Sequence, residues 1–140
     1  MRRFDRHVRD FLARNPDGVI VHIGCGLDTR YERIGNDHVE WFDLDVPEVM
    51  ELRKKLISTS APHYHAIAAS VFDTHWLVEV ECSMPRPFLF IAEGVFPYFE
   101  EAHVKELFLR LSEHFPGSAL SNTDTHDCCH ECVAGNHGFG

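Results

Sequence analysis

Acidic residues follow the apolar segments of this sequence at the points where strands would end. Asp28 comes shortly after the first such segment, Asp45 closes the second, and Glu93 directly follows a later one. Asp73 lies just beyond a weaker segment between the last two. In an open parallel sheet, ligands bind outside the carboxyl ends of the strands. These carboxylates therefore fall where a sheet would bind a ligand.

Two glycines, Gly24 and Gly26, break the chain sharply after the first apolar segment. Without a Cβ, both let the backbone turn tightly and approach a ligand closely. A dinucleotide fingerprint would need a third glycine where Thr29 stands. Asp28 would repel a pyrophosphate at a helix N-terminus, but it suits the sulfonium and ammonium of S-adenosylmethionine. The loop therefore favours S-adenosylmethionine over a nicotinamide cofactor, although a plain tight turn explains the two glycines equally well.

The roles of Asp45 and Glu93 each have a structural alternative. An acid at the end of the second strand can accept both ribose hydroxyls of an adenosine ligand. Asp45 could instead cap the helix that starts at Pro47. Glu93 follows five apolar residues, and a half-buried carboxylate needs a partner. A ligand ammonium or sulfonium would serve, whereas a helix-capping or backbone-bonded glutamate is the alternative.

Strands alternate with helices over residues 1–122. Apolar runs predict the strands, and apolar residues at helical spacing predict the helices. This alternation implies βαβ units, and right-handed crossovers favour a Rossmann-like α/β fold with a parallel sheet of about five strands. The predicted strands cover 19–23, 40–45, 65–69, 88–92 and 118–122; the helical stripes are Phe4, Val8, Phe11 and Leu12, then Val49, Leu52 and Leu56, then Trp76, Leu77 and Val80 after a cap at Asp73, then Val104, Leu107, Phe108, Leu111 and Phe115.

Residues 123–140 are polar and lack periodicity, so we expect an irregular C-terminal tail behind the core. The tail has enough ligand chemistry for one zinc ion, but the spacing matches no standard site and we expect no bound metal. The remaining histidines, His22 among them, show no triad spacing and are expected at the surface or as filler. The possible ligands in the tail are His126, Cys128, Cys129, His130, Cys132 and His137.

An excess of acidic residues, 22 against 13 basic ones, gives the 140-residue chain a net charge of −9. An acidic surface argues against nucleic acid as the main partner. No apolar run approaches the ~20 residues that a membrane-spanning helix needs, and no secretory signal is visible. We therefore expect a cytoplasmic protein with reduced thiols and no membrane partner.

Four blocks of the sequence stand together in a specific order and spacing. They read VHIGCGLDTR at 21–30, WFDLDVPEV at 41–49, SVFD at 70–73 followed by Trp76, and FIAEGVFPY at 90–98. Over roughly residues 4–120 the chain resembles the leucine carboxyl methyltransferase family, including its polyketide O-methyltransferase branch. The resemblance implies a class I methyltransferase fold, S-adenosylmethionine as cofactor, and methyl transfer to a carboxylate or hydroxyl oxygen. The acceptor could be a small molecule or a protein C-terminus.

The resemblance also implies which residues bind the cofactor. It places Gly24 and Glu93 near the methionine part, Asp45 near the ribose, and the turn at 70–71 near the adenine, while residues 28–30 shape the loop after the first strand. No catalytic residue can be named. The full expected set is Gly24, Cys25, Gly26, Asp28, Arg30, Asp45, Ser70, Val71, Asp73, Glu93 and Gly94.

The sequence departs from the family pattern in three respects. Many members have an acidic residue where Ser70 stands, and they carry an N-terminal segment whose Lys and Arg contact the cofactor. They also continue past the fifth strand, so we expect a truncated member whose open sheet edge could pair with a second copy. Two alternatives to an active methyltransferase follow: a non-catalytic fragment that binds cofactor or a partner, and an NAD-dependent oxidoreductase, which Asp28 and Thr29 disfavour.

Overall fold

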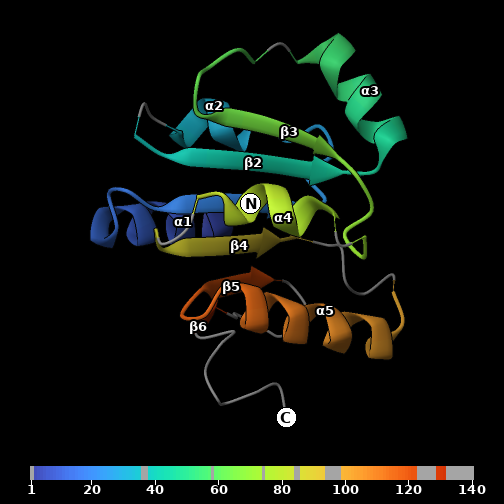
Figure 1. Ribbon diagram of the computed structural model, residues 1–140. Coiled ribbons are helices and arrows are strands. Elements are labelled where there is room, and N and C mark those ends of the chain that lie inside the picture. The colour runs from blue at the N-terminus through green and yellow to red at the C-terminus, as the bar shows by residue number, and fades with distance from the viewer. Residues whose placement is uncertain are drawn as a thin grey trace.

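The computed structural model describes residues 2–35, 38–57, 59–73, 75–83, 86–93, 99–122 and 129–131. Its strands form one six-stranded sheet in the order β3-β2-β1-β4-β5-β6 (Figure 1). The first five strands run parallel, and β6 runs antiparallel to β5. The strands are β1 (Val19–Ile23), β2 (Glu40–Asp45), β3 (Tyr64–Ala68), β4 (Phe88–Ala92), β5 (Ala119–Asn122) and β6 (Cys129–Glu131).

The direction of the strand order reverses at β1, which lies between β2 and β4. Every residue of β1 and β4 is buried, as expected for central strands of a parallel sheet that is covered on both faces. Ile23 at the end of β1 pairs with Leu44 and Ala92, so three strands end side by side. Open α/β sheets bind their ligands at such a reversal point.

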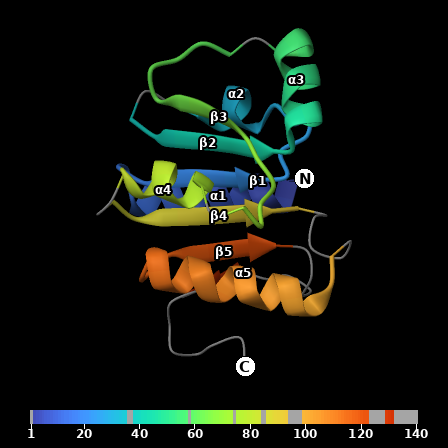
Figure 2. The same cartoon turned by 45° about the vertical axis from the view of Figure 1, so that its right-hand side comes forward.

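The helices of the described residues cover both faces of the sheet. Figure 2 shows α4 and α5 on one face and α1 on the other. Alternate residues of β1 point to opposite faces, so Val21 packs into the core that contains Leu77 and Leu107, and Ile20 into the core that contains Phe11. The helices are α1 (Arg2–Arg14), α2 (Arg30–Ile34), α3 (Pro47–Leu56), α4 (His75–Glu81) and α5 (Glu101–His114).

The predicted parallel sheet is confirmed, and β1, β2 and β4 have the predicted bounds. β3 starts one residue earlier than predicted, at Tyr64, and β5 starts one residue later, at Ala119. The apolar stripes predicted for α1, α4 and α5 supply the buried residues of those helices. The helical spacing of apolar residues was sufficient to predict the buried faces of these helices, because each stripe packs on an apolar face of the sheet.

The prediction that α3 packs against the sheet through Leu52 and Leu56 is wrong. Leu52 and Leu56 are 47% and 63% exposed. The residues that α3 buries are Met50 and Arg53. Arg53 faces the sheet because it donates a hydrogen bond of 2.8 Å to the buried carboxylate of Asp43 on β2. A buried charge requires a paired partner, so the position of one acidic residue decides which face of α3 turns inward.

The C-terminal tail also differs from the expectation. Residues 129–131 form β6 and pair with Ala119–Ser121 of β5, so the chain itself covers the sheet edge that we expect to be open. A three-residue strand is too short to show an alternating pattern. The other tail residues lie outside the described residues, so the expected absence of zinc stays a prediction.

The structure contains no helix, among the residues it describes, that is both long and apolar enough to cross a bilayer.

Candidate functional site

A hollow opens at the carboxyl ends of β1, β2 and β3, toward which the strand arrows point in Figure 1. Its empty volume, which includes space open to solvent, is about 410 Å³. Its walls are mostly apolar, with Asp45 as the charged residue among those that line it. Four predicted cofactor-binding residues line it, namely Gly24, Asp45, Ser70 and Val71, and the others are Ile23, Leu44, Val46, Ala69 and Phe99.

Both carboxylate oxygens of Asp45 accept hydrogen bonds from the backbone. The N–H of Gly26 donates to Oδ2 at 2.9 Å, and the N–H of Val46 donates to Oδ1 at 2.7 Å. A carboxylate offers about four lone-pair sites, so about half of its accepting capacity remains for donors in the hollow. The alternative role of Asp45 as the cap of α3 is wrong, because the N-cap of α3 is Val46.

The loop after β1 approaches the hollow through its backbone. Gly24 and Gly26 have φ angles of 69° and 53°, which non-glycine residues adopt rarely. A Cβ on Gly26 would meet no atom within 4 Å, so the space above this residue is open. Cys25 turns its side chain the other way, into the core, where Sγ lies 3.7 Å from Sδ of Met50. Burial raises the pKa of this thiol, and Cys25 can serve a ligand only through its backbone.

Arg30 joins the acidic residues beside the loop into one cluster. Its guanidinium is completely buried and donates to Oδ1 of Asp5 at 2.7 Å and to Oε1 of Glu93 at 3.0 Å. Oδ2 of Asp28 lies 3.4 Å from the same guanidinium. Arg30 is therefore a partner of the Glu93 carboxylate, which we expect to need one. Nothing in the sequence indicates that the Arg30 side chain is buried. Asp28 and Glu93 border the loop after β1 but do not line the hollow.

A second buried polar network lies beneath the loop, centred on Asp43. This carboxylate accepts hydrogen bonds from Trp41 at 2.8 Å and from Tyr64 at 2.6 Å, in addition to Arg53. His22 Nδ1 is 3.5 Å away. Burial alone would raise the pKa of Asp43, but these donors and charges outweigh burial and hold the pKa below its usual value.

The surface position expected for most of the histidines does not hold for His22. His22 is buried, and its Nε2 lies 3.2 Å from Nη1 of Arg30. Because an arginine can only donate, Nε2 must accept, and the proton of a neutral His22 sits on Nδ1, toward Asp43. A sequence signal for this network existed, since His22 and Asp43 are polar residues in the middle of apolar strands.

The remaining predicted residues have local roles or fall outside the hollow. The Oγ of Ser70 accepts the N–H of Phe72 at 3.2 Å. The carboxylate of Asp73 accepts the N–H of His75, the first residue of α4, at 3.2 Å, but position 74, directly before the helix, lies outside the described residues, so the predicted cap stays a prediction. Gly94 lies outside the described residues. Phe99, which we did not predict, lines the hollow and packs edge-on against Phe72, with ring centroids 4.8 Å apart.

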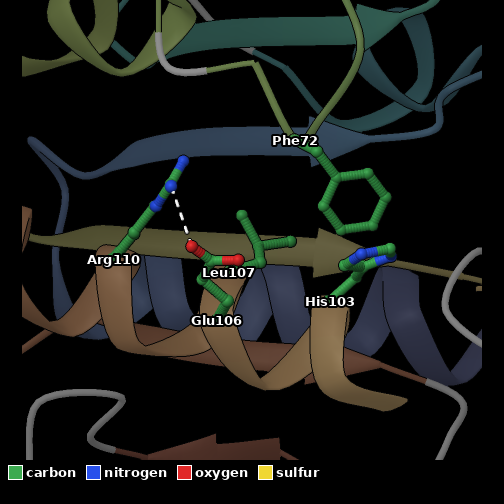
Figure 3. Close-up of a pocket in the computed structure, with 5 residues that line it drawn as sticks. All are labelled: Phe72, His103, Glu106, Leu107 and Arg110. Carbon is green, nitrogen blue, oxygen red and sulfur yellow. Dashed lines mark hydrogen bonds and ion pairs between the residues drawn. The ribbon is translucent and has the colours of Figure 1, made fainter. Parts of the chain in front are cut away.

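A second hollow of about 450 Å³ empty volume lies between α5 and the segment after β3. Figure 3 shows its lining, with the ring of Phe72 beside His103 and the Glu106–Arg110 ion pair further along the helix. The ion pair measures 2.9 Å and is partly exposed. None of the predicted site residues lines this hollow, and its two charged residues satisfy each other.

We expect Asp5→Asn to make the unfolding free energy less dependent on pH in the acidic range. Burial alone would raise the pKa of Asp5, but hydrogen bonds from Arg30 and Arg33 outweigh it and lower that pKa. A carboxyl with a depressed folded-state pKa stabilises the fold above its unfolded-state pKa, and the contribution disappears as the pH falls through the folded-state pKa.

Urea unfolding at intervals between about pH 7 and pH 2 measures this difference. The wild type should lose stability more steeply than Asp5→Asn below about pH 5. Asp10→Asn, at an exposed position of the same helix, is the matched control. Parallel curves for the wild type and Asp5→Asn would contradict the prediction.

Comparison with known proteins gives the family. The sequence model described as "Leucine carboxyl methyltransferase" matches residues 1–112. The tetracenomycin polyketide synthesis O-methyltransferase TcmP of Streptomyces glaucescens is 42% identical over 120 residues, covering 85% of this chain and 43% of that protein. The S-adenosyl-L-methionine-dependent methyltransferase dpfgK of Gibberella zeae is 32% identical over 118 residues, covering 79% and 39%. The chain thus spans about two fifths of the length of these relatives.

Solved structures show the same fold at low sequence identity. The glycopeptide N-methyltransferase MtfA complexed with S-adenosyl-L-methionine has a TM-score of 0.57 at 16% identity, covering 83% of this chain and 48% of that one. A putative S-adenosyl-L-methionine-dependent methyltransferase of Methanococcus maripaludis has a TM-score of 0.57 at 13% identity, covering 86% and 55%. The predicted Rossmann-like methyltransferase fold is confirmed. With a family match over most of its length, the chain belongs to the leucine carboxyl methyltransferase family.

Proposed function

We propose that this chain binds S-adenosylmethionine in the hollow at the carboxyl ends of β1–β3, and that it forms the cofactor-binding part of an O-methyltransferase. The observation that carries the proposal is the position of Asp45. Its carboxylate lines the hollow at the strand-order reversal and retains accepting capacity after binding the loop. The two relatives, an O-methyltransferase and an S-adenosyl-L-methionine-dependent methyltransferase by name, support the same activity.

The residues present fit this cofactor. Asp45 would accept the ribose hydroxyls, and the apolar side chains of Val71 and Phe99 would pack against the adenine ring. The open space above Gly26 gives a ligand close access to the backbone. Glu93 keeps part of its side chain exposed beside Arg30, where it would attract the ammonium of the methionine part.

Bound S-adenosylmethionine supplies an electrophilic methyl carbon on its sulfonium. The chain's own contribution is to hold that cofactor in one orientation, with a backbone loop and a carboxylate whose positions are set by hydrogen bonds. Fixed alignment of donor and acceptor in a site from which water is excluded accounts for much of the rate of such transfers.

For the acceptor, we propose an oxygen of a small molecule, as the name of TcmP suggests for that relative. A protein C-terminal carboxylate is the second candidate, and the family description favours it. The net charge of −9 supports neither nucleic acid nor an anionic membrane surface as partner. We also propose a cytoplasmic location, which the free thiols of Cys25 and Cys82 support.

Calorimetric titration of the chain with S-adenosylmethionine, S-adenosylhomocysteine and NAD tests the proposal. We expect both adenosylated ligands to bind at about one per chain, with no binding of NAD, because Asp28 disfavours a pyrophosphate and Thr29 replaces the third glycine of a dinucleotide fingerprint. Binding of NAD alone would favour an oxidoreductase instead. Binding of the adenosylated ligands without methyl transfer to an added oxygen acceptor would favour a non-catalytic binding module.

A further inference from the structure

The backbone of Gly26 is held at both its N–H and its carbonyl oxygen. Its N–H donates to Asp45 Oδ2 at 2.9 Å, and its carbonyl oxygen accepts a hydrogen bond of 2.9 Å from Nη1 of Arg53. Arg53 comes from the second turn of α3, 27 residues further along the chain. Gly26 has a positive φ and, as a glycine, no side chain that could pack and hold it. The N–H groups of Gly24 and Cys25 donate to the carbonyl oxygen of Leu44, and the two hydrogen bonds of Gly26 join the next part of the loop to Asp45 and to α3.

The guanidinium of Arg53 is itself held from the opposite side. Nη2 donates to Asp43 Oδ2 at 2.8 Å, and both side chains are almost completely buried. Nε lies 3.4 Å from the hydroxyl of Tyr64. A planar fork that satisfies a carboxylate with one nitrogen and a carbonyl with the other fixes the direction of both bonds. Asp43 on β2 thus sets the position of Gly26 through Arg53.

A buried ion pair of this kind has no clear advantage for stability alone. The cost of removing two charges from water often exceeds their attraction, and well-packed apolar side chains of similar volume stabilise equally well or better. An apolar side chain at position 53, however, could not reach the Gly26 carbonyl with a donor. The feature that distinguishes Arg53 from an apolar residue is its hydrogen bond to the loop.

We propose that Arg53 is a positioning residue for the cofactor, which acts by holding the Gly26 carbonyl so that the loop after β1 keeps its ligand-binding shape. This inference rests on the proposed function, because it assumes that the hollow binds S-adenosylmethionine. Arg53 does not line the hollow, so it acts on the ligand only through the loop. A site held in its binding geometry before the ligand arrives binds more tightly, because less ordering remains to be done.

Arg53→Lys is the most informative single variant. Lysine keeps a positive charge opposite Asp43, but its three N–H donors sit on one nitrogen, so it lacks the two separated nitrogens with which Arg53 binds Asp43 and the Gly26 carbonyl. We expect its affinity for S-adenosylhomocysteine to fall about tenfold. The control is Val80→Ala, which opens a small cavity under α4 and lowers the melting temperature without contacting the loop. Its affinity should stay within about twofold of the wild type.

A double variant tests the proposal if Arg53→Lys does not fold. Asp43→Asn with Arg53→Met removes both buried charges together; the asparagine oxygen can still accept from Trp41, and its NH2 group can donate to the Tyr64 hydroxyl in place of the bond that Asp43 accepts. It should fold and still bind S-adenosylhomocysteine about tenfold more weakly than the wild type. Wild-type affinity in either folded variant would overturn the proposal, and so would an equal loss of affinity in Val80→Ala.

Hydrogen exchange of the ligand-free chain separates this proposal from the proposed function. In Arg53→Lys the amide of Gly26 should exchange faster than in the wild type or in Val80→Ala, because the loop opens more often. If the wild type does not bind S-adenosylhomocysteine, the proposed function fails whatever the exchange shows. If the wild type binds and the Gly26 amide exchanges equally in all variants, the positioning role of Arg53 fails alone.

Discussion

Asp45→Asn should lower the affinity for S-adenosylhomocysteine about a hundredfold. The two oxygens of Asp45 match the two vicinal hydroxyl donors of a ribose. Hydrogen bonds to a charged group contribute roughly 1.5–3 kcal/mol each. With partial compensation by water, the loss of both comes to about 3 kcal/mol. Calorimetry on the wild type and the variant measures the change.

The same variant should also lose some stability, which makes a control on the ligand necessary. Both oxygens of Asp45 accept backbone N–H groups, from Gly26 and Val46, and asparagine can accept only one of them. The cost is about 1 kcal/mol of unfolding free energy. Loss of affinity could then come from a shifted loop as well as from the ribose contacts.

A ligand without the two hydroxyls separates these causes. The 2′,3′-dideoxy analogue of S-adenosylhomocysteine should bind the wild type and Asp45→Asn with nearly equal affinity, because neither contact exists with this analogue. Asp17→Asn, an exposed position at the opposite end of β1, is the matched control and should bind like the wild type. An equal affinity loss for both ligands in Asp45→Asn would exclude the ribose role.

The largest stability effect is expected for Arg30→Met, which should lose about 3–5 kcal/mol of unfolding free energy. Arg30 is completely buried and pairs with the carboxylates of Asp5, Asp28 and Glu93. Its removal leaves these negative charges close together, with the more exposed Arg33 still pairing with Asp5 and Asp28. It also removes a guanidinium that lies 5.8 Å from the ring centre of Phe4, a favourable contact in itself. A loss of this size is a large part of the ~5–15 kcal/mol that stabilises a typical domain.

Arg33→Met is the matched control for this experiment. Arg33 pairs with Asp5 and Asp28 as well, but its side chain is 36% exposed. Exposed ion pairs contribute about 0–1 kcal/mol because water screens them. Urea unfolding of both variants at neutral pH measures the difference. Equal losses would mean that burial does not set the strength of these pairs and would contradict the prediction.

Several features of the protein were decided by the sequence itself. The apolar runs of β1 and β4 and the helical stripes of α1 and α5 predict those elements, because local periodicity and burial coincide there. Their alternation determines a parallel sheet. A parallel sheet in turn brings the ends of β1, β2 and β3 to one edge, which is why Gly24, Asp45 and the turn at 70–71 could be placed together.

The tertiary structure alone decided which polar residues are buried and what they contact. Arg30 meets Asp5, 25 residues earlier, and Glu93, 63 residues later. The inward turn of Arg53 and the outward turn of Leu52 follow from the carboxylate of Asp43. Periodicity assigns an arginine to the solvent side, because its cost of burial is prohibitive without partners. Those partners come from distant segments, and only folding brings them together.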